Sequence, residues 1–245
     1  MKKILLTFVG LVSCSIIYAQ EVDNFKPIQG NVTAELNVNP FNGQISLNNT
    51  INQLRGRYFV KNDIALRVGL GLNMVDTVGT TGDPYGTNSN YRSMTFKSNA
   101  YDLSIGVEKH FNGTKRLSPF VGIEVSYGNK NSKYTEKTSN YELEVENGWY
   151  EQYIEFNNGG WSRTRMVQLG YKRFGVAAIA GFDFYISKNF YFGYEFNLAY
   201  NSTDYKEPKI TSSGSYTQSN NEITDNSSSN FGAKLSNGIR LGFAF

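Results

Sequence analysis

Eight segments of about ten residues, in which apolar and polar side chains alternate, constrain the fold of this chain more than any other feature. Successive side chains of a β-strand point to opposite faces, so strict alternation predicts a strand with one apolar face. The expected strands span residues 31–38, 51–60, 64–75, 95–111, 119–128, 169–185, 190–201 and 230–245. The pattern predicts an all-β fold, an eight-stranded antiparallel transmembrane β-barrel in which neighbouring strands follow one another along the chain.

The connections between these segments alternate in length. Short connections at 61–63, 112–118 and 187–189 alternate with long ones, rich in Asn, Ser, Thr and Gly, at 76–94, 129–168 and 202–229. Outer-membrane barrels have short periplasmic turns and long extracellular loops, and we expect the same division here. Leu169 and Tyr171 are out of phase with Phe174, which predicts a β-bulge near Gly175.

The short connection at 61–63 sets the register of one hairpin. As a three-residue loop it would place Val60 opposite Ile64 on the apolar face and Arg57 opposite Arg67 on the other face. Two guanidinium groups side by side repel, and neither can lose its proton. An acidic side chain is therefore expected beside the pair.

The amino-terminal residues predict export. Lys2 and Lys3 precede an apolar stretch, and Ala19 is the small residue expected before a cleavage site. We expect a signal peptide at 1–19, cleaved after Ala19, and an outer-membrane β-barrel domain at 20–245. Residues 11–14, Leu-Val-Ser-Cys, also resemble a lipobox, which would make Cys14 a lipidated first residue; the apolar residues after Cys14 favour ordinary cleavage.

Charge and residue counts exclude several functions. The formal net charge is +3, and without Lys2 and Lys3 it falls to +1, so no basic excess remains for nucleic acid. The single cysteine is Cys14, and the single histidine, His110, is expected at the periplasmic interface. We predict no catalytic, cofactor-binding or metal site, and no cofactor.

The face opposite the apolar one carries charges of both signs. An eight-stranded barrel has a lumen that side chains can just fill, and buried charges must pair. We expect a lumen charge network of Glu35, Arg55, Arg57, Arg67, Asp102, Glu108, Glu124, Asp183, Glu195, Lys234 and Arg240. Glu35, Asp102 or Glu108 is expected to contact the Arg57–Arg67 pair. Removing that acid should cost more stability than replacing it and both arginines together with apolar residues.

Aromatic residues gather at the ends of the expected strands, as in the aromatic girdles of outer-membrane barrels. The expected periplasmic girdle is Phe111, Phe182, Phe184, Phe190, Phe192, Phe243 and Phe245, and the expected outer girdle is Tyr101, Tyr127 and Tyr200.

The longest connection contains a turn signal. Asn147-Gly148 between two alternating segments predicts a hairpin over residues 141–156. In that hairpin Glu144 would face Glu151, which is unfavourable unless something cationic binds nearby. The hairpin is therefore a candidate contact surface for an extracellular partner, either a basic protein or a divalent cation, although a merely solvated hairpin would have the same sequence.

The carboxyl-terminal residues 234–245 resemble the assembly signal of outer-membrane barrels, with Ser236, Gly238, Leu241, Phe243 and the terminal Phe245 at the matching positions. The whole chain resembles small outer-membrane barrels of the OmpX and OmpA-transmembrane type. This resemblance implies a monomer in the outer membrane of a Gram-negative bacterium, in contact with lipid and with the assembly machinery. It also implies a non-catalytic role in envelope integrity, adhesion or surface interaction. A narrow solute channel and a lipid-modifying enzyme are the alternatives.

Overall fold

The computed structural model describes residues 25–38, 51–82, 91–155, 161–215, 226–235 and 239–245. Its strands are β1 (Val32–Val38), β2 (Ile51–Lys61), β3 (Ile64–Thr81), β4 (Arg92–His110), β5 (Leu117–Thr138), β6 (Tyr141–Glu146), β7 (Gly148–Glu155), β8 (Trp161–Gln168), β9 (Tyr171–Tyr185), β10 (Phe190–Tyr205), β11 (Lys209–Gly214), β12 (Ser227–Leu235) and β13 (Ile239–Ala244). In these parts of the chain, no helix is long and apolar enough to span a membrane. The expected signal peptide lies outside the described residues.

The strands close into an antiparallel ring. β1 to β5 pair in chain order, β5 then pairs with β9, β9 with β10, and β13 pairs with both β10 and β1. β12 pairs with the outer part of β10, so β12 and β13 together form the eighth member of the ring. This arrangement confirms the eight-stranded antiparallel barrel, and each predicted segment overlaps a strand of the ring.

The register agrees with the sequence in the first hairpin and departs from it at the turn. Arg57 pairs with Arg67, as expected. Lys61 rather than Val60 lies opposite Ile64, because the register shifts between Phe59 and Lys61. The three-residue loop was therefore a wrong expectation: an extra residue on β2 forms a bulge, which shortens the turn.

The bulge predicted near Gly175 is also wrong. β9 pairs with β10 and with β5 without a register shift from Tyr171 to the end of the strand. Tyr171 lies on the same side of β9 as Arg173, whose guanidinium is 5.5 Å from the tyrosine ring. Leu169 precedes β9, so no bulge within the strand is needed to explain its phase.

Large apolar side chains cover the outside of the ring. Exposed members of this belt include Val32, Leu36, Leu54, Tyr58, Leu66, Val68, Leu103, Ile105, Val121, Ile123, Val176, Leu198 and Leu241. On β9 the outward positions are apolar from Phe174 to Phe184, a span close to the ~9–11 residues that a tilted strand needs to cross a bilayer. A soluble protein does not expose a continuous apolar belt, so this surface contacts lipid.

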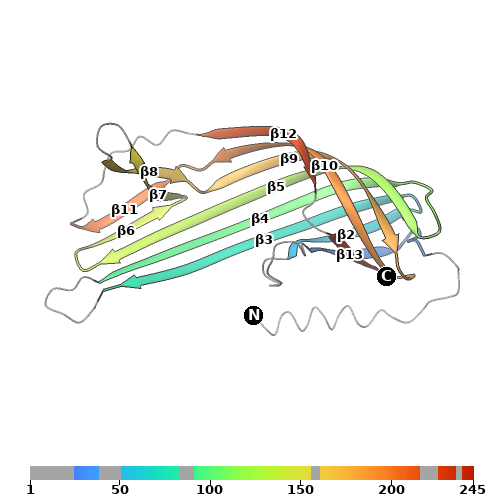
Figure 1. Cartoon of the computed structure of the whole chain (residues 1–245), viewed down its shortest axis with the longest axis horizontal. Coiled ribbons are helices and arrows are strands. Elements are labelled where there is room, and N and C mark those ends of the chain that lie inside the picture. Colours follow the sequence, from blue (N-terminus) through green and yellow to red (C-terminus); the bar gives the residue numbers. More distant parts are fainter. Residues whose placement is uncertain (1–24, 39–50, 83–90, 156–160, 216–225, 236–238) are drawn as a thin grey trace.

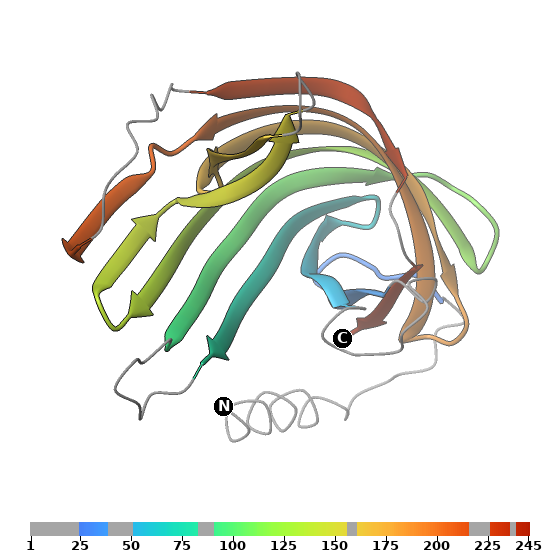
Figure 2. The ribbon, with the colours of Figure 1, turned by 60° about the vertical axis from the view of Figure 1, so that its left-hand side comes forward.

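Several strands continue well beyond the belt. β3, β4 and β5 run far past the ring, whereas β2 and β13 lie at one end of the molecule (Figure 1). The β3–β4 register extends to Thr81 and Arg92, and the β4–β5 register to Arg92 and Thr138. β6 pairs with β5, and β11 pairs with β6, which widens this part into a curved outer sheet (Figure 2). The long connections are therefore largely strands, where the sequence analysis expected loops.

The predicted hairpin over residues 141–156 is wrong. β6 folds back on β5, and β7 pairs with β8, so Glu144 lies opposite Thr135 while Glu151 pairs with Arg165. A two-residue hairpin turn of the predicted type needs positive φ at both central residues. Among the described non-glycine residues only Asn147 has a positive φ, 56°, and Gly148 is not among the positive-φ glycines.

The inner side of the outer sheet carries an apolar cluster. Tyr134, Leu143 and Val145 are buried there, and the rings of Phe96 and Trp149 pack against them. The Trp149 ring lies 4.5 Å from the Tyr134 ring and 5.4 Å from the Phe96 ring, centroid to centroid. This packing, rather than local turn propensity, holds β7 against the inner face of the sheet that contains β4, β5 and β6.

Candidate functional site: the filled lumen

Charged side chains fill the middle of the barrel. Eight of the eleven residues expected in the lumen network are buried there: Glu35, Arg55, Arg57, Arg67, Glu108, Asp183, Glu195 and Arg240. They come from seven different strands, β1 to β4, β9, β10 and β13, because alternation aims every second side chain inward. Four arginines face four carboxylates in this layer, so the layer is balanced in charge.

Arg57 is the most connected member of the layer. Its Nε lies 2.5 Å from Glu35, its Nη1 2.9 Å from Glu108 and its Nη2 2.8 Å from Asp183. The same Nη2 donates a 2.8 Å hydrogen bond to the hydroxyl of Tyr191, which itself donates to Glu35. The guanidinium thus bridges strands from both halves of the chain.

The other three arginines extend this network. Arg67 contacts Glu108 at 2.7 Å, Glu124 at 2.8 Å and Glu195 at 3.1 Å. Arg55 contacts Glu195 at 2.9 Å. Arg240 contacts Asp183 at 2.8 Å and Glu35 at 3.2 Å. Each carboxylate of the layer therefore lies within ion-pair distance of at least two arginines.

The acids considered for the Arg57–Arg67 pair separate into two groups. Glu108 lies between the two arginines and contacts both, and Glu35 contacts Arg57. Asp102 does not reach the pair; it lies higher on β4 and binds Arg173 at 2.6 Å, where both side chains are partly exposed. Glu124 is at the edge of the layer, and the side chain of Lys234 is outside what the structure describes.

An aromatic layer closes the lumen at the end where the short turns after β2, β4 and β9 lie. Phe59, Phe120, Tyr185 and Tyr191 are each at most 1% exposed. The rings of Tyr185 and Tyr191 are 5.0 Å apart, and the Arg57 guanidinium lies 5.3 Å from the Tyr191 ring. The sequence analysis missed this layer, although these four residues share the inward phase of Arg57, Gly122, Asp183 and Glu195 on their own strands.

His110 is the last residue of β4, at the expected end of the strand, but its side chain is buried inside the barrel and not at the membrane interface as predicted. Its ring packs between Phe59 and Phe120, with Nδ1 3.0 Å from Ser118 Oγ and Nε2 3.3 Å from Glu108. These three residue types also occur in catalytic triads. Ser118 is only 3% exposed and Glu108 is bound by two arginines, so these contacts link the strands at this end of the lumen.

The first and last strands of the ring, β1 and β13, meet beside this layer. The backbone N–H of Phe245 donates to Val32, and the side chain of Asn31 donates a 2.8 Å hydrogen bond to the carbonyl of Phe245. The rings of Phe243 and Phe245 meet edge to face with their centroids 5.0 Å apart, and Leu241 is exposed on the belt. Ser236 and Gly238, the other two residues expected in the assembly signal, lie outside the described residues.

A second polar cluster lies in the outer sheet, nine residues along β5 from the girdle residue Tyr127. Glu136 accepts hydrogen bonds from Arg92 at 2.8 and 3.0 Å, from Tyr134 at 2.8 Å and from Tyr141 at 2.5 Å. Burial alone would raise the pKa of Glu136, but these bonds lower it below its ordinary value of 4.5.

This cluster predicts a pH-dependent contact between β5 and β6. Because the pKa of Glu136 is lowered in the fold, the ionised form stabilises the outer sheet above pH 4.5. That contribution is lost as the pH falls through the lowered pKa. In a Trp161→Phe variant, the fluorescence of Trp149, which stacks on Tyr134, should change in this acidic range. Glu136→Gln should abolish the transition, and an unchanged transition would assign it to another group.

A closed antiparallel ring with an apolar belt outside and charged side chains inside defines an integral outer-membrane β-barrel. Residues 36–227 match the profile of the OmpA-OmpF-like porin family, and the chain belongs to this family. The match confirms the resemblance to OmpA-type barrels expected from the sequence and places the protein in the outer membrane of Gram-negative bacteria.

Two solved structures match this chain at low similarity. The N-terminal β-barrel domain of Pseudomonas aeruginosa OprF is 13% identical, covers 89% of this chain and 98% of its own, and has a TM-score of 0.33. Ail, the attachment invasion locus protein of Yersinia pestis, is 13% identical, covers 89% of this chain and 100% of its own, and has a TM-score of 0.30. A search of curated proteins gave no significant match. The fold assignment rests on the strand pairing rather than on these two structures.

Proposed function

We propose that the protein is a closed, non-conducting and non-catalytic barrel that acts through its presence in the outer membrane and through the sheet that it displays outside. The filled lumen carries this proposal. Four arginines and four carboxylates, each at most 8% exposed, lie above an aromatic layer that is at most 1% exposed. A solute path would have to break several buried ion pairs, each costly to disrupt.

Planar-bilayer recordings test whether the lumen is closed. Refolded protein, checked by heat-modifiable migration, should give no stable conductance steps in membranes where a large porin conducts. The physical reason is that an eight-stranded barrel has room for its own side chains and little else. Reproducible steps from the intact protein would favour the narrow-channel alternative and contradict the closed state.

The outer sheet supports the proposal that the protein acts through a surface displayed outside the cell. Glu142 and Glu144 on β6 pair with Lys137 and Lys133 on β5, at 3.6 and 2.7 Å. The acidic row expected to attract a basic partner is therefore partly neutralised within the sheet. We propose the whole outer sheet, rather than a separate acidic hairpin, as the surface that meets an extracellular partner.

Cysteine labelling tests which end of the barrel faces outward. The only cysteine of the chain is Cys14, in the expected signal peptide, so a single engineered cysteine gives a clean signal. A membrane-impermeant maleimide should label Ser139→Cys, in the turn before β6, on intact cells. Asn62→Cys, in the turn between β2 and β3, should react only after the cells are opened. The opposite pattern would invert the orientation.

Export and insertion complete the proposal. We propose cleavage after Ala19 and recognition of Leu241, Phe243 and Phe245 by the assembly machinery, with the protein inserted as a monomer in contact with outer-membrane lipid. The outward exposure of Leu241 on the closing strand supports this recognition. The mass of the mature protein distinguishes cleavage after Ala19 from lipidation at Cys14.

A further inference from the structure

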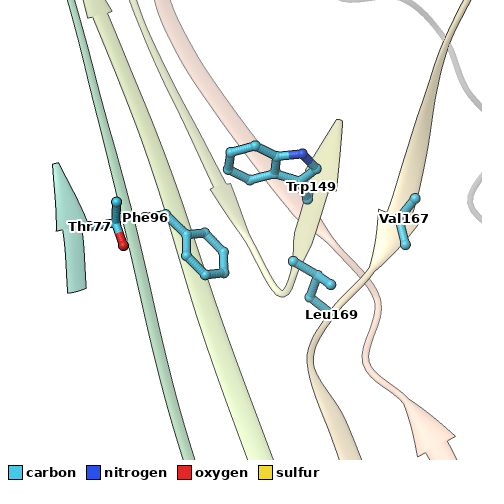
Figure 3. Close-up of a pocket in the computed structure, with 5 residues that line it drawn as sticks. All are labelled: Thr77, Phe96, Trp149, Val167 and Leu169. Atoms are coloured by element: carbon cyan, nitrogen blue, oxygen red, sulfur yellow. The ribbon is translucent and has the colours of Figure 1, made fainter. Parts of the chain in front are cut away.

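A pocket of about 460 Å³ opens on the inner side of the outer sheet. Thr77 of β3 and Phe96 of β4 form one wall, and Trp149, Val167 and Leu169 form the other (Figure 3). Thr77 and Phe96 are register partners, so their side chains lie next to each other on one face. The volume falls within the ~300–1,000 Å³ range of pockets that hold small molecules.

The walls of this pocket are held by contacts with each other and with the neighbouring strands. Trp149 is held by the rings of Phe96 and Tyr134. The carbonyl of Asn147 accepts the backbone N–H groups of Leu169, at 2.8 Å, and Gly170, at 3.1 Å, and the N–H of Asn147 donates to Ser132 at 2.7 Å. These bonds tie β7 and the start of β9 to β5. The pocket is therefore formed without a ligand, which lowers the cost of binding one.

The chemistry of the lining selects the kind of ligand. The five described residues that line the pocket carry no charge, and Thr77 contributes the one hydroxyl group. Two aromatic rings and two branched aliphatic side chains favour an apolar ligand with a flat ring or a compact alkyl group. A charged molecule would lose its hydration there without gaining a partner from these side chains.

The position of the pocket separates it from the bilayer. Leu72 of β3 pairs with Tyr101, a residue of the expected outer girdle. Thr77 is five residues farther along β3, so Thr77 lies ~16 Å beyond this girdle along the strand. The pocket also faces the barrel axis, because Thr77 alternates with the outward-facing Val78. Its ligand must come from the medium outside the cell rather than from the lipid belt.

We propose that the pocket formed by Thr77, Phe96, Trp149, Val167 and Leu169 is an extracellular binding site for a small, neutral, hydrophobic molecule. The site is independent of the closed lumen, so a conductance measurement does not bear on it. Its occupant contacts Trp149 directly, which provides the signal for a test.

Energy transfer from tryptophan to N-phenyl-1-naphthylamine, a neutral aromatic fluorophore, tests the site. The chain has two tryptophans, and Trp161→Phe leaves Trp149 as the single donor. In nanodiscs, this variant should show saturable transfer from Trp149 to the fluorophore. Adding Thr77→Phe fills the pocket with a ring and should weaken the saturable component at least tenfold. Transfer that does not saturate, as expected for dye dissolved in lipid, would overturn the proposal.

Val78→Phe is the matched control, because it adds the same ring to the next residue of β3 on the opposite face. Val78 is 64% exposed, so this change should leave saturable transfer within twofold of the parent. Leu169→Asn provides a second test if Thr77→Phe fails to fold, since it places an amide in the opposite wall and should also weaken binding at least tenfold. Equal transfer in Thr77→Phe, Leu169→Asn and Val78→Phe would place the fluorophore elsewhere.

Discussion

Glu108→Ala should lower the free energy of unfolding by about 3–5 kcal/mol, because it removes one partner from a buried group of charges. Glu108 is fully buried and contacts Arg57 at 2.9 Å and Arg67 at 2.7 Å. Without Glu108, the guanidinium groups of the register partners Arg57 and Arg67 have one fewer carboxylate to neutralise them. Urea unfolding of the refolded barrel in lipid vesicles measures the loss.

Asp102→Ala is the matched control for this prediction. Asp102 lies on the same strand and the same face as Glu108, but its ion pair with Arg173 is more than a third exposed on both sides. Exposed pairs contribute about 0–1 kcal/mol, so this variant should unfold close to the parent. Equal losses in the two variants would show that burial of the charge is not what makes Glu108 important.

The contacts of Arg57 and Arg67 reverse one expectation about replacing them together with their acidic partner. From the sequence, apolar replacement of Arg57, Arg67 and their acid together was expected to cost less than loss of the acid alone. The two arginines also contact Glu35, Asp183, Glu195 and Glu124. The triple replacement would leave these four acids with only Arg55 and Arg240, so it should now destabilise the barrel more than Glu108→Ala.

Gly242→Ala should prevent the barrel from closing correctly. A Cβ added at Gly242 would overlap the ring of Tyr191. That ring cannot move aside, because it is fully buried and its hydroxyl is bonded to both Arg57 and Glu35. Overpacking a rigid core costs about 1–3 kcal/mol or more, and here it also forces β13 away from β10. The yield of heat-modifiable protein in the outer membrane measures the effect.

Gly232→Ala tests whether the effect depends on Tyr191. Gly232 lies in β12, in the other part of the eighth member of the ring, and a Cβ there meets no atom within 4 Å. This variant should assemble with the same yield as the parent. A low yield for Gly232→Ala would indicate that both glycines serve strand flexibility, and the steric explanation for Gly242 would then be wrong.

The sequence predicted the part of the fold that lies in lipid and missed most of the part outside it. Within the membrane, lipid on one side and a narrow lumen on the other enforce alternation, so the strands could be located from residues such as Leu103, Ile105 and Val107. Beyond the membrane both faces of a strand can be polar, while the backbone hydrogen bonds between neighbouring strands continue unchanged. Residues 76–81 and 129–138 therefore looked like loops although they are strands.

The sequence predicted which side chains line the lumen better than it predicted their contacts. Alternation alone identifies which side chains point inward, and it would also have placed Phe59, Phe120, Tyr191 and His110 there. His110 was instead assigned to the interface by its chemical type, and the three aromatic residues were not assigned to a position. The partners of each arginine depend on the tilt and stagger of the strands, which a sequence pattern does not reveal.

The seam between β1 and β13 has a consequence for the order of assembly. Thr33 pairs with Ala244, so the contact that closes the ring joins residues from the two ends of the described chain. The same step brings Arg240 to Glu35, at 3.2 Å, and Arg57 to Asp183, at 2.8 Å. Until the final strand arrives, charges from both halves of the chain lack these partners. Contacts of such long sequence separation form slowly. We therefore expect closure and neutralisation to occur together and late, and a chain stopped before β13 would lack Arg240 and keep four carboxylates with three arginines.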